Sequence, residues 1–131
     1  MTGRVVHFEV PYDDGDRARA FYAEVFGWKI NEMPEMQYTS VSTGPVTDEG
    51  YPGEPGYING GMFERSANSP ATLPVVTVEV DDADAALESI EQHGGKTVAA
   101  KFPVGEMGFA AYFEDCEGNV LGLWQSAAPS S

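Results

Sequence analysis

The chain has 131 residues, of which 42% are hydrophobic and 11% aromatic, enough apolar material for a single packed domain. Its formal net charge of −14 excludes nucleic acid and anionic membrane surfaces as partners. No apolar run reaches the roughly 20 residues of a membrane span, and no signal sequence precedes the first strand. The single cysteine allows no intrachain disulfide. We therefore expect a cytoplasmic protein.

The first predicted strand covers residues 4–10 and is expected to end at Pro11. Alternation places His7 and Glu9 on one face and the apolar side chains of Val6, Phe8 and Val10 on the other. Burying the polar face without partners would cost about 1–3 kcal/mol per group. This face therefore needs either an internal partner or a ligand.

A helix is predicted next, because Asp13, Asp14 and Asp16 suit a helix start and Gly27 suits its end. One apolar stripe follows the helical period along it, formed by Ala18, Phe21, Tyr22, Val25 and Phe26. Strands are expected at residues 28–30, 38–42 and 57–63, with a long loop at 43–56. Gly60-Gly61 in the last of these strands indicates a bulge or a close backbone approach.

The second half repeats this plan. A strand at 75–80 leads to a helix that starts at Asp81-Asp82 and carries the stripe Ala83, Ala86, Leu87 and Ile90; strands at 97–101, 109–114 and 120–124 follow. Residues 13–30 align with 81–98 without a gap, while His7 aligns with either Val75 or Thr77. We therefore expect one domain, 1–131, made of two β-α-β-β-β modules at about 4–63 and 72–125.

Three stretches resemble the vicinal oxygen chelate superfamily, which contains glyoxalase, bleomycin-resistance and extradiol dioxygenase domains. They are His7 with Asp14 and the aromatic helix that runs into Phe26-Gly27-Trp28, the helix opening Val80-Asp81-Asp82, and residues 112–124 with their Gly118-Asn119 turn. The resemblance covers about residues 5–125 and is nearest to a glyoxalase-related subgroup of small bacterial proteins. It implies an α+β fold whose two modules form curved sheets around a concave pocket, with the helices outside.

The resemblance also implies positions for about four metal ligands, and this sequence fills few of them. His7 matches the ligand of the first strand, but Val75 or Thr77 and Gly122 stand where other ligands are expected, and Asn59 is the polar side chain of residues 57–63. We therefore expect an incomplete metal site and no cofactor. A divalent metal held by His7 and Glu9 with unorthodox ligands remains the alternative.

His7 and Glu9 are the candidate catalytic or anchoring pair, in which the carboxylate tunes the imidazole. The alternative is a polar pair at a strand edge or the remnant of a metal site. Tyr112, Gly122 and Trp124 are the candidates for contacting a ligand, with Gly122 leaving space and Trp124 offering a stacking wall; ordinary core packing is their alternative. Further ligand-binding candidates are Tyr38, Asn59 and Met62.

The leading functional hypothesis is a small-molecule-binding protein that holds an apolar or aromatic organic ligand, with His7 and Glu9 as polar anchors. The alternative is an enzyme, either a metal-dependent lyase, isomerase or dioxygenase, or a metal-free catalyst with His7 as general base. A purely structural or interaction module is a third class. Exposed apolar edges of the modules also predict a homodimer.

Overall fold

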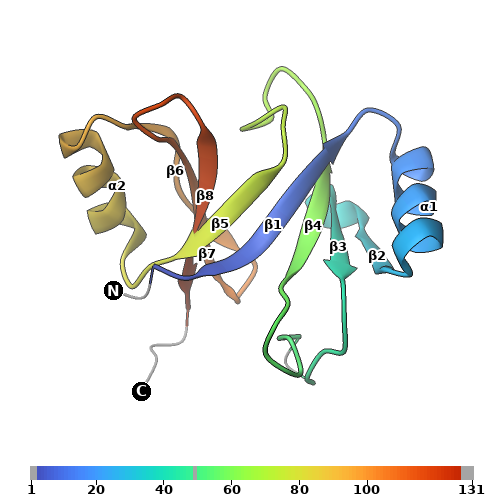
Figure 1. Cartoon of the computed structure of the whole chain (residues 1–131). Helices are drawn as coiled ribbons and strands as arrows, with labels where there is room; N and C mark the ends of the chain where they lie inside the picture. Colours follow the sequence, from blue (N-terminus) through green and yellow to red (C-terminus); the bar gives the residue numbers. More distant parts are fainter. Residues whose placement is uncertain (1–2, 49, 128–131) are drawn as a thin grey trace. The chain divides into compact units, whose positions relative to one another are not determined.

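The computed structural model describes residues 3–48 and 50–127 (Figure 1). The chain divides into two compact units. The first unit is His7–Pro74, and the second unit contains the described residues before His7 and from Val75 onward. Each unit has a small set of strands and one α-helix.

The first unit contains β1 (Val5–Tyr12), α1 (Gly15–Phe26), β2 (Lys29–Met33), the short 3-10 helix η1 (Pro34–Met36), β3 (Tyr38–Ser42) and β4 (Asn59–Glu64). The first two residues of β1 belong to the second unit. Its strand order is β2-β3-β4-β1. β1 and β4 are parallel, and the other neighbours are antiparallel.

The second unit contains β5 (Val75–Glu79), α2 (Ala83–Gln92), β6 (Lys96–Val104), β7 (Gly108–Glu114) and β8 (Val120–Ser126). Its strand order is β6-β7-β8-β5, with β5 and β8 parallel and the other neighbours antiparallel. Both units thus have the same element succession and the same strand order. The predicted α+β fold of two β-α-β-β-β modules is confirmed.

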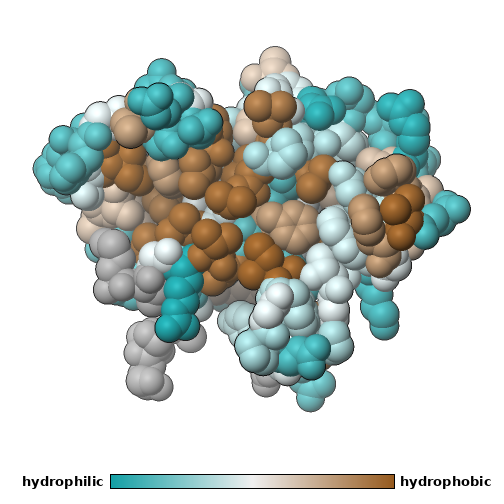
Figure 2. All heavy atoms as spheres, in the orientation of Figure 1, coloured by the Kyte–Doolittle hydropathy of each residue, from teal (hydrophilic) through white to brown (hydrophobic). Residues whose placement is uncertain are grey.

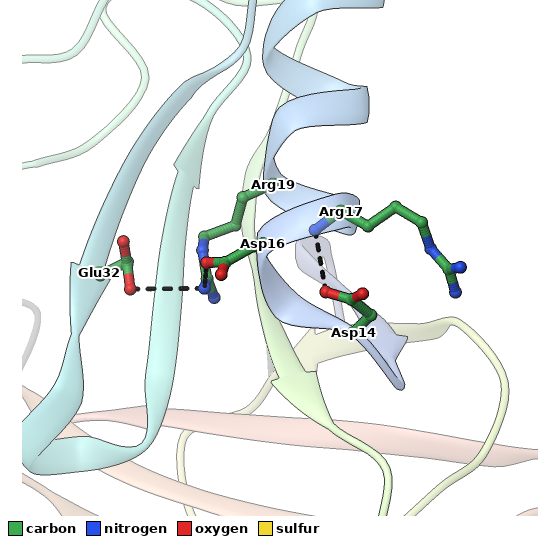
Figure 3. A network of polar contacts seen from close by, with 5 residues as sticks. All are labelled: Asp14, Asp16, Arg17, Arg19 and Glu32. Atoms are coloured by element: carbon green, nitrogen blue, oxygen red, sulfur yellow. Dashed lines mark hydrogen bonds and ion pairs between the residues drawn. The ribbon is translucent and has the colours of Figure 1, made fainter.

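The two long helices begin in the same way. Asp14 and Asp82 are both extended, and each carboxylate accepts the backbone N–H of the residue three positions later. Asp14 accepts from Arg17 at 3.1 Å (Figure 3), and Asp82 accepts from Ala85, also at 3.1 Å. These contacts satisfy donors that a helix start leaves unpaired. The equivalent caps support the gapless alignment of residues 13–30 with 81–98.

α2 packs into the core of the second unit as predicted. Ala83, Ala86 and Leu87 are buried, with Ile90 partly buried beside them. The sheet contributes Ala111, Phe113 and Leu123 to the same cluster, as the alternation of β7 and β8 predicts. The apolar stripe of this helix therefore serves its own unit.

α1 differs, because none of its residues is buried. Tyr22 stacks on Trp28 at 4.8 Å, and Trp28 in turn contacts Phe8, so part of the predicted stripe meets its own sheet. Phe21, Val25 and Phe26, by contrast, are 54%, 56% and 60% exposed. The prediction of one buried apolar stripe thus holds for α2 but not for all of α1.

Two further details of the strands differ from the sequence-based expectation. β1 continues through Pro11 to Tyr12, because a proline removes one N–H donor but its φ suits an extended strand. Gly60-Gly61 is a close approach, since a Cβ on Gly60 would overlap the backbone and ring of Phe8. In residues 3–48 and 50–127 no helix is long and apolar enough to cross a membrane.

Candidate functional site

The polar face of the first unit is built on three adjacent strands. In the parallel ladder of β1 and β4, His7 lies beside Asn59 and Glu9 beside Gly61. In the antiparallel ladder of β3 and β4, Ser40 lies beside Gly61. Paired residues project to the same face and the period of a strand is two, so Tyr38 shares this face with His7 and Glu9.

These three side chains are joined by hydrogen bonds. The Tyr38 hydroxyl donates to Oε2 of Glu9 at 2.7 Å and lies 2.8 Å from Nε2 of His7. His7 Nε2 and Glu9 Oε2 are themselves 4.0 Å apart, so the phenol bridges them. The His7 and Tyr38 rings are also nearly parallel, with centroids 6.5 Å apart. We call this arrangement the Glu9–Tyr38–His7 relay.

The relay determines the tautomer of the histidine. Tyr38 has one hydroxyl proton, and it is donated to the Glu9 carboxylate. The Tyr38 oxygen must then accept from His7, which places the imidazole proton on Nε2. A neutral ring with Nε2–H keeps its lone pair on Nδ1. His7 therefore presents a hydrogen-bond acceptor and a base at Nδ1.

Burial favours the neutral form of the His7 ring. Removal from water lowers the pKa of His7 below its ordinary 6.5, and the nearby Glu9 carboxylate opposes this by raising it, with burial the larger effect. Glu9 is only 6% exposed, whereas the His7 side chain is 34% exposed. The carboxylate is thus the inner end of the relay and the imidazole its accessible end.

Gly61 makes the relay sterically feasible. A Cβ at this position would overlap the hydroxyl and ring of Tyr38, so the phenol occupies the space that any larger residue would fill. Tyr38 was predicted to bind a ligand, not to link His7 to Glu9. The signal in the sequence was Gly61, which is the ladder partner of Glu9 and has no side chain. A glycine at this place leaves room for a side chain from a neighbouring strand.

Asn59 lies next to His7 but its amide is only partly satisfied. Its Oδ1 accepts the backbone N–H of Thr43 at 2.8 Å, which identifies Nδ2 as the amide nitrogen. Nδ2 is buried and has no hydrogen-bond partner among the described residues. Met62, in contrast, lies on the opposite face of β4 at 0% exposure, so the structure does not bring it to the polar face.

The second unit carries the other predicted contact residues. Tyr112 and Thr77 both lie beside Gly122 in their ladders, and Trp124 lies beside Ala110. A Cβ on Gly122 would lie 2.8 Å from Oγ1 of Thr77, so the space expected at this glycine is taken by the threonine hydroxyl. Tyr112 also stacks near Phe102, with ring centroids 6.3 Å apart.

The donor set does not suit a metal ion. Of the positions that the family resemblance assigns to ligands, His7 alone offers an imidazole or a carboxylate, and its Nε2 is engaged by Tyr38. Within the described ranges no three His, Cys, Asp or Glu side chains are grouped so that they could hold a metal. We therefore derive no chemical step through a metal.

An open depression in the first unit lies away from the relay. It is lined by acidic residues at the start of α1, together with Tyr12, Gly15 and Arg19. Arg19 already pairs with Asp16 at 2.8 Å and with Glu32 at 3.5 Å (Figure 3). These ion pairs engage Arg19 and Asp16, and Asp13, Asp14 and Glu64 also line the depression.

Comparison with known proteins gives consistent matches. Residues 4–44 match the family model of the bleomycin resistance protein-like N-terminal domain. A glyoxylase-like domain-containing protein from Didymella fabae is 28% identical over 122 residues, which is 91% of each chain. A putative glyoxylase from Mycobacterium tuberculosis is 26% identical over 116 residues, covering 86% of this chain but only 42% of that longer protein.

Among solved structures, Streptomyces coelicolor methylmalonyl-CoA epimerase superposes with a TM-score of 0.69 at 19% identity, covering 100% of this chain and 99% of the epimerase. At that identity the likeness establishes the fold and leaves the activity open. The duplicated β-α-β-β-β architecture, the bleomycin-resistance match and the glyoxylase-like relatives agree with one another. The chain is thus similar in sequence to bleomycin-resistance and glyoxylase-like proteins, and it has the fold of the glyoxalase, bleomycin-resistance and dioxygenase structures.

Proposed function

We propose that the chain binds a small organic molecule that has an apolar or aromatic body and a hydrogen-bond donor, with His7 as its polar anchor. The Glu9–Tyr38–His7 relay carries this proposal, because it presents the neutral acceptor Nδ1 at the accessible end of a buried carboxylate. A hydroxyl or N–H of the ligand can bond Nδ1 without bringing a charge into the site. Tyr112 and Trp124, on the sheet of the second unit, are separate candidates for aromatic contacts.

Two naphthalene probes that differ in one donor test this proposal by titration calorimetry. 1-Naphthol carries a hydroxyl, whereas 1-methoxynaphthalene has the same ring system without a donor. We expect the protein to bind 1-naphthol about tenfold more tightly, because one hydrogen bond that adds about 1.4 kcal/mol to the binding free energy changes the affinity tenfold. His7→Ala should abolish the preference. His93→Ala, which changes the exposed second histidine, should leave it intact, and a preference that survives His7→Ala would contradict the proposal.

A second candidate function is proton transfer, which the neutral state of His7 favours. As a general base, Nδ1 would take a proton from a carbon next to a carbonyl. The electron pair of the broken C–H bond would move to the carbonyl oxygen as an enolate, and return of the proton to either face would give exchange or epimerisation. The relay would stabilise the imidazolium through Tyr38 and Glu9.

Methylmalonyl-CoA, which is named in the Streptomyces epimerase and is bound in another solved epimerase structure, serves as a probe of this second function. Proton NMR in D2O should show loss of the C2 proton signal with the wild-type protein and with His93→Ala. His7→Ala should reduce the rate by about 100-fold or more, as loss of a general base does. Exchange at the uncatalysed rate with the wild-type protein would reject catalysis on this compound and leave the binding function standing.

A further inference from the structure

We propose that Asn59 is a second anchor beside His7, and that the two side chains together recognise the edge of an amide, as a lactam or carboxamide ligand presents it. Nδ2 of Asn59 donates to the ligand carbonyl, while Nδ1 of His7 accepts the ligand N–H. The inference rests on the proposed function, in which His7 binds a donor of the ligand. It names the group that stands next to that donor.

The amide nitrogen of Asn59 is the observation that carries this proposal. Among the buried side-chain nitrogen and oxygen atoms of residues 3–48 and 50–127, Nδ2 of Asn59 is the one without a hydrogen-bond partner. A buried N–H that lacks an acceptor destabilises the folded chain, because folding removes its bonds to water. Such a group calls for a bound partner, either a ligand or an internal water.

The loop before β4 fixes the direction of this donor. Oδ1 of Asn59 accepts the backbone N–H of Thr43 at 2.8 Å. The Thr43 hydroxyl in turn donates to the carbonyl oxygen of Ile58 at 2.7 Å, which ties residue 43 to the start of β4. Turning the amide over would set Nδ2 against the Thr43 N–H, two donors facing each other. The amide is therefore held with its N–H groups on the other side.

His7 supplies the complementary acceptor next to this donor. His7 and Asn59 are partners in the parallel ladder of β1 and β4, so their side chains project from the same face. Neighbouring strands are about 4.8 Å apart, a spacing that two side-by-side hydrogen bonds to one small group can bridge. Because Tyr38 engages Nε2, the free lone pair of the neutral ring is on Nδ1. A lactam matches this pair, since its ring holds the N–H and the C=O on one edge.

The second unit gives an internal comparison. Thr77 and Gly122 are ladder partners there, as His7 and Asn59 are in the first unit. Oγ1 of Thr77 lies 2.8 Å from the place of a Cβ on Gly122, so this position is filled from within. The module therefore folds without an amide at this point. Oδ1 of Asn59 has a structural role at Thr43, whereas folding gives no reason for its Nδ2.

The polar edge of the ligand is a better guide to its class than its apolar body. Figure 2 shows brown and tan side chains over α1, at the right of the view, so apolar surface is not confined to one site. Polar groups at fixed positions provide specificity in small-molecule sites. A carboxylate ligand would set an acceptor against the lone pair of Nδ1, and a chain of net charge −14 repels anions. An amide brings one donor and one acceptor without charge.

Two bicyclic probes that differ in the carbonyl group test the proposal by titration calorimetry at pH 8. Indole offers an N–H alone, whereas oxindole offers an N–H beside a C=O. We expect the wild-type protein to bind oxindole about tenfold more tightly than indole, because the second bond satisfies a donor that is buried without one. Equal affinities would mean that Nδ2 holds at most an internal water, and would overturn the proposal.

Asn59→Asp removes the donor and keeps an acceptor for Thr43, and Asn59→Leu removes the donor without adding a charge. Both variants should keep the wild-type circular dichroism and bind oxindole and indole with affinities within about twofold of each other. Asn68→Asp, the same change at an exposed loop residue, should keep the tenfold preference. A tenfold preference in both Asn59 variants would overturn the proposal.

The outcome can be separated from that of the proposed function. A wild-type protein that prefers 1-naphthol to 1-methoxynaphthalene but does not prefer oxindole to indole would keep His7 as an anchor and reject Asn59. Absence of binding of all four compounds at 1 mM would overturn both proposals. In the oxindole complex, the Nδ2 proton signals of Asn59 in a nitrogen–proton NMR spectrum should move downfield, and indole should leave them in place.

Discussion

Tyr38 is the residue on which the candidate site depends most directly, because it contacts both His7 and Glu9. Tyr38→Phe keeps the ring but removes the hydroxyl that donates to a carboxylate at 6% exposure. We expect the free energy of unfolding to fall by about 1–3 kcal/mol, measured by urea denaturation. Tyr51→Phe, at a tyrosine that is 60% exposed, is the matched control and should change it by less than about 0.5 kcal/mol. Equal effects of the two substitutions would show that the relay contributes nothing to stability.

The depressed pKa of His7 predicts a dependence of stability on pH. The folded state binds the His7 proton less tightly than the unfolded state, whose histidine titrates near 6.5. The contribution of neutral His7 to stability is therefore complete above about pH 6.5 and is lost as the pH falls from there toward the folded pKa. Urea denaturation at several pH values should show a shallower decline for His7→Gln than for the wild type. Identical declines would mean that burial does not disfavour the charged ring.

Gly61→Ala tests whether the close approach on β4 is required. The added methyl group would overlap the Tyr38 phenol, so the ring must move away from Glu9 and His7. We expect a loss of about 1–3 kcal/mol in stability and a histidine pKa that shifts away from its wild-type value. Ser40→Ala, at the ladder partner of Gly61, should keep the wild-type pKa of His7. A wild-type pKa in Gly61→Ala would show that the phenol tolerates the methyl group.

At the scale of the elements, the two helices differ in how they use their apolar stripes. Leu87→Ala should destabilise the protein by about 2–5 kcal/mol, since Leu87 is 7% exposed in the α2 core. Val25→Ala on α1 should cost less than about 0.5 kcal/mol under the same conditions, since Val25 is 56% exposed. A large loss in Val25→Ala under these conditions would place Val25 in the core of its own unit.

The helices and their caps could be predicted from the sequence because they depend on local patterns. Asp14 and Asp82 are short-range signals, and both cap as expected. The stripe of α1 could not be divided into inner and outer residues, because periodicity reports which residues are apolar and not what covers them. Similarly, alternation placed His7 and Glu9 together on one face, but their link comes from Tyr38, which is about 30 residues away in sequence.

At the scale of the whole molecule, the duplication explains both what the two modules share and where they differ. The units have one topology, yet His7 and Asn59 lie side by side in the first, while Thr77 and Gly122 lie side by side in the second. Gly122 was expected to leave room for a ligand, but the bulk of Thr77 could not be positioned without the register of β5 and β8. The imidazole and the amide of the first unit are thus replaced by a hydroxyl and a glycine at the equivalent positions of the second unit.

The protonation state of His7 tests this account most directly. Nitrogen-detected proton correlation spectra of labelled protein distinguish Nδ1 from Nε2, and exposed His93 provides the second signal for reference. We predict that the His7 resonances at pH 8 are those of a neutral ring protonated at Nε2. Its pKa should lie below 6.5 and should fall further when a ligand donates a hydrogen bond to Nδ1. A charged ring at this pH, or a neutral ring protonated at Nδ1, would contradict the relay and the proposed role of His7.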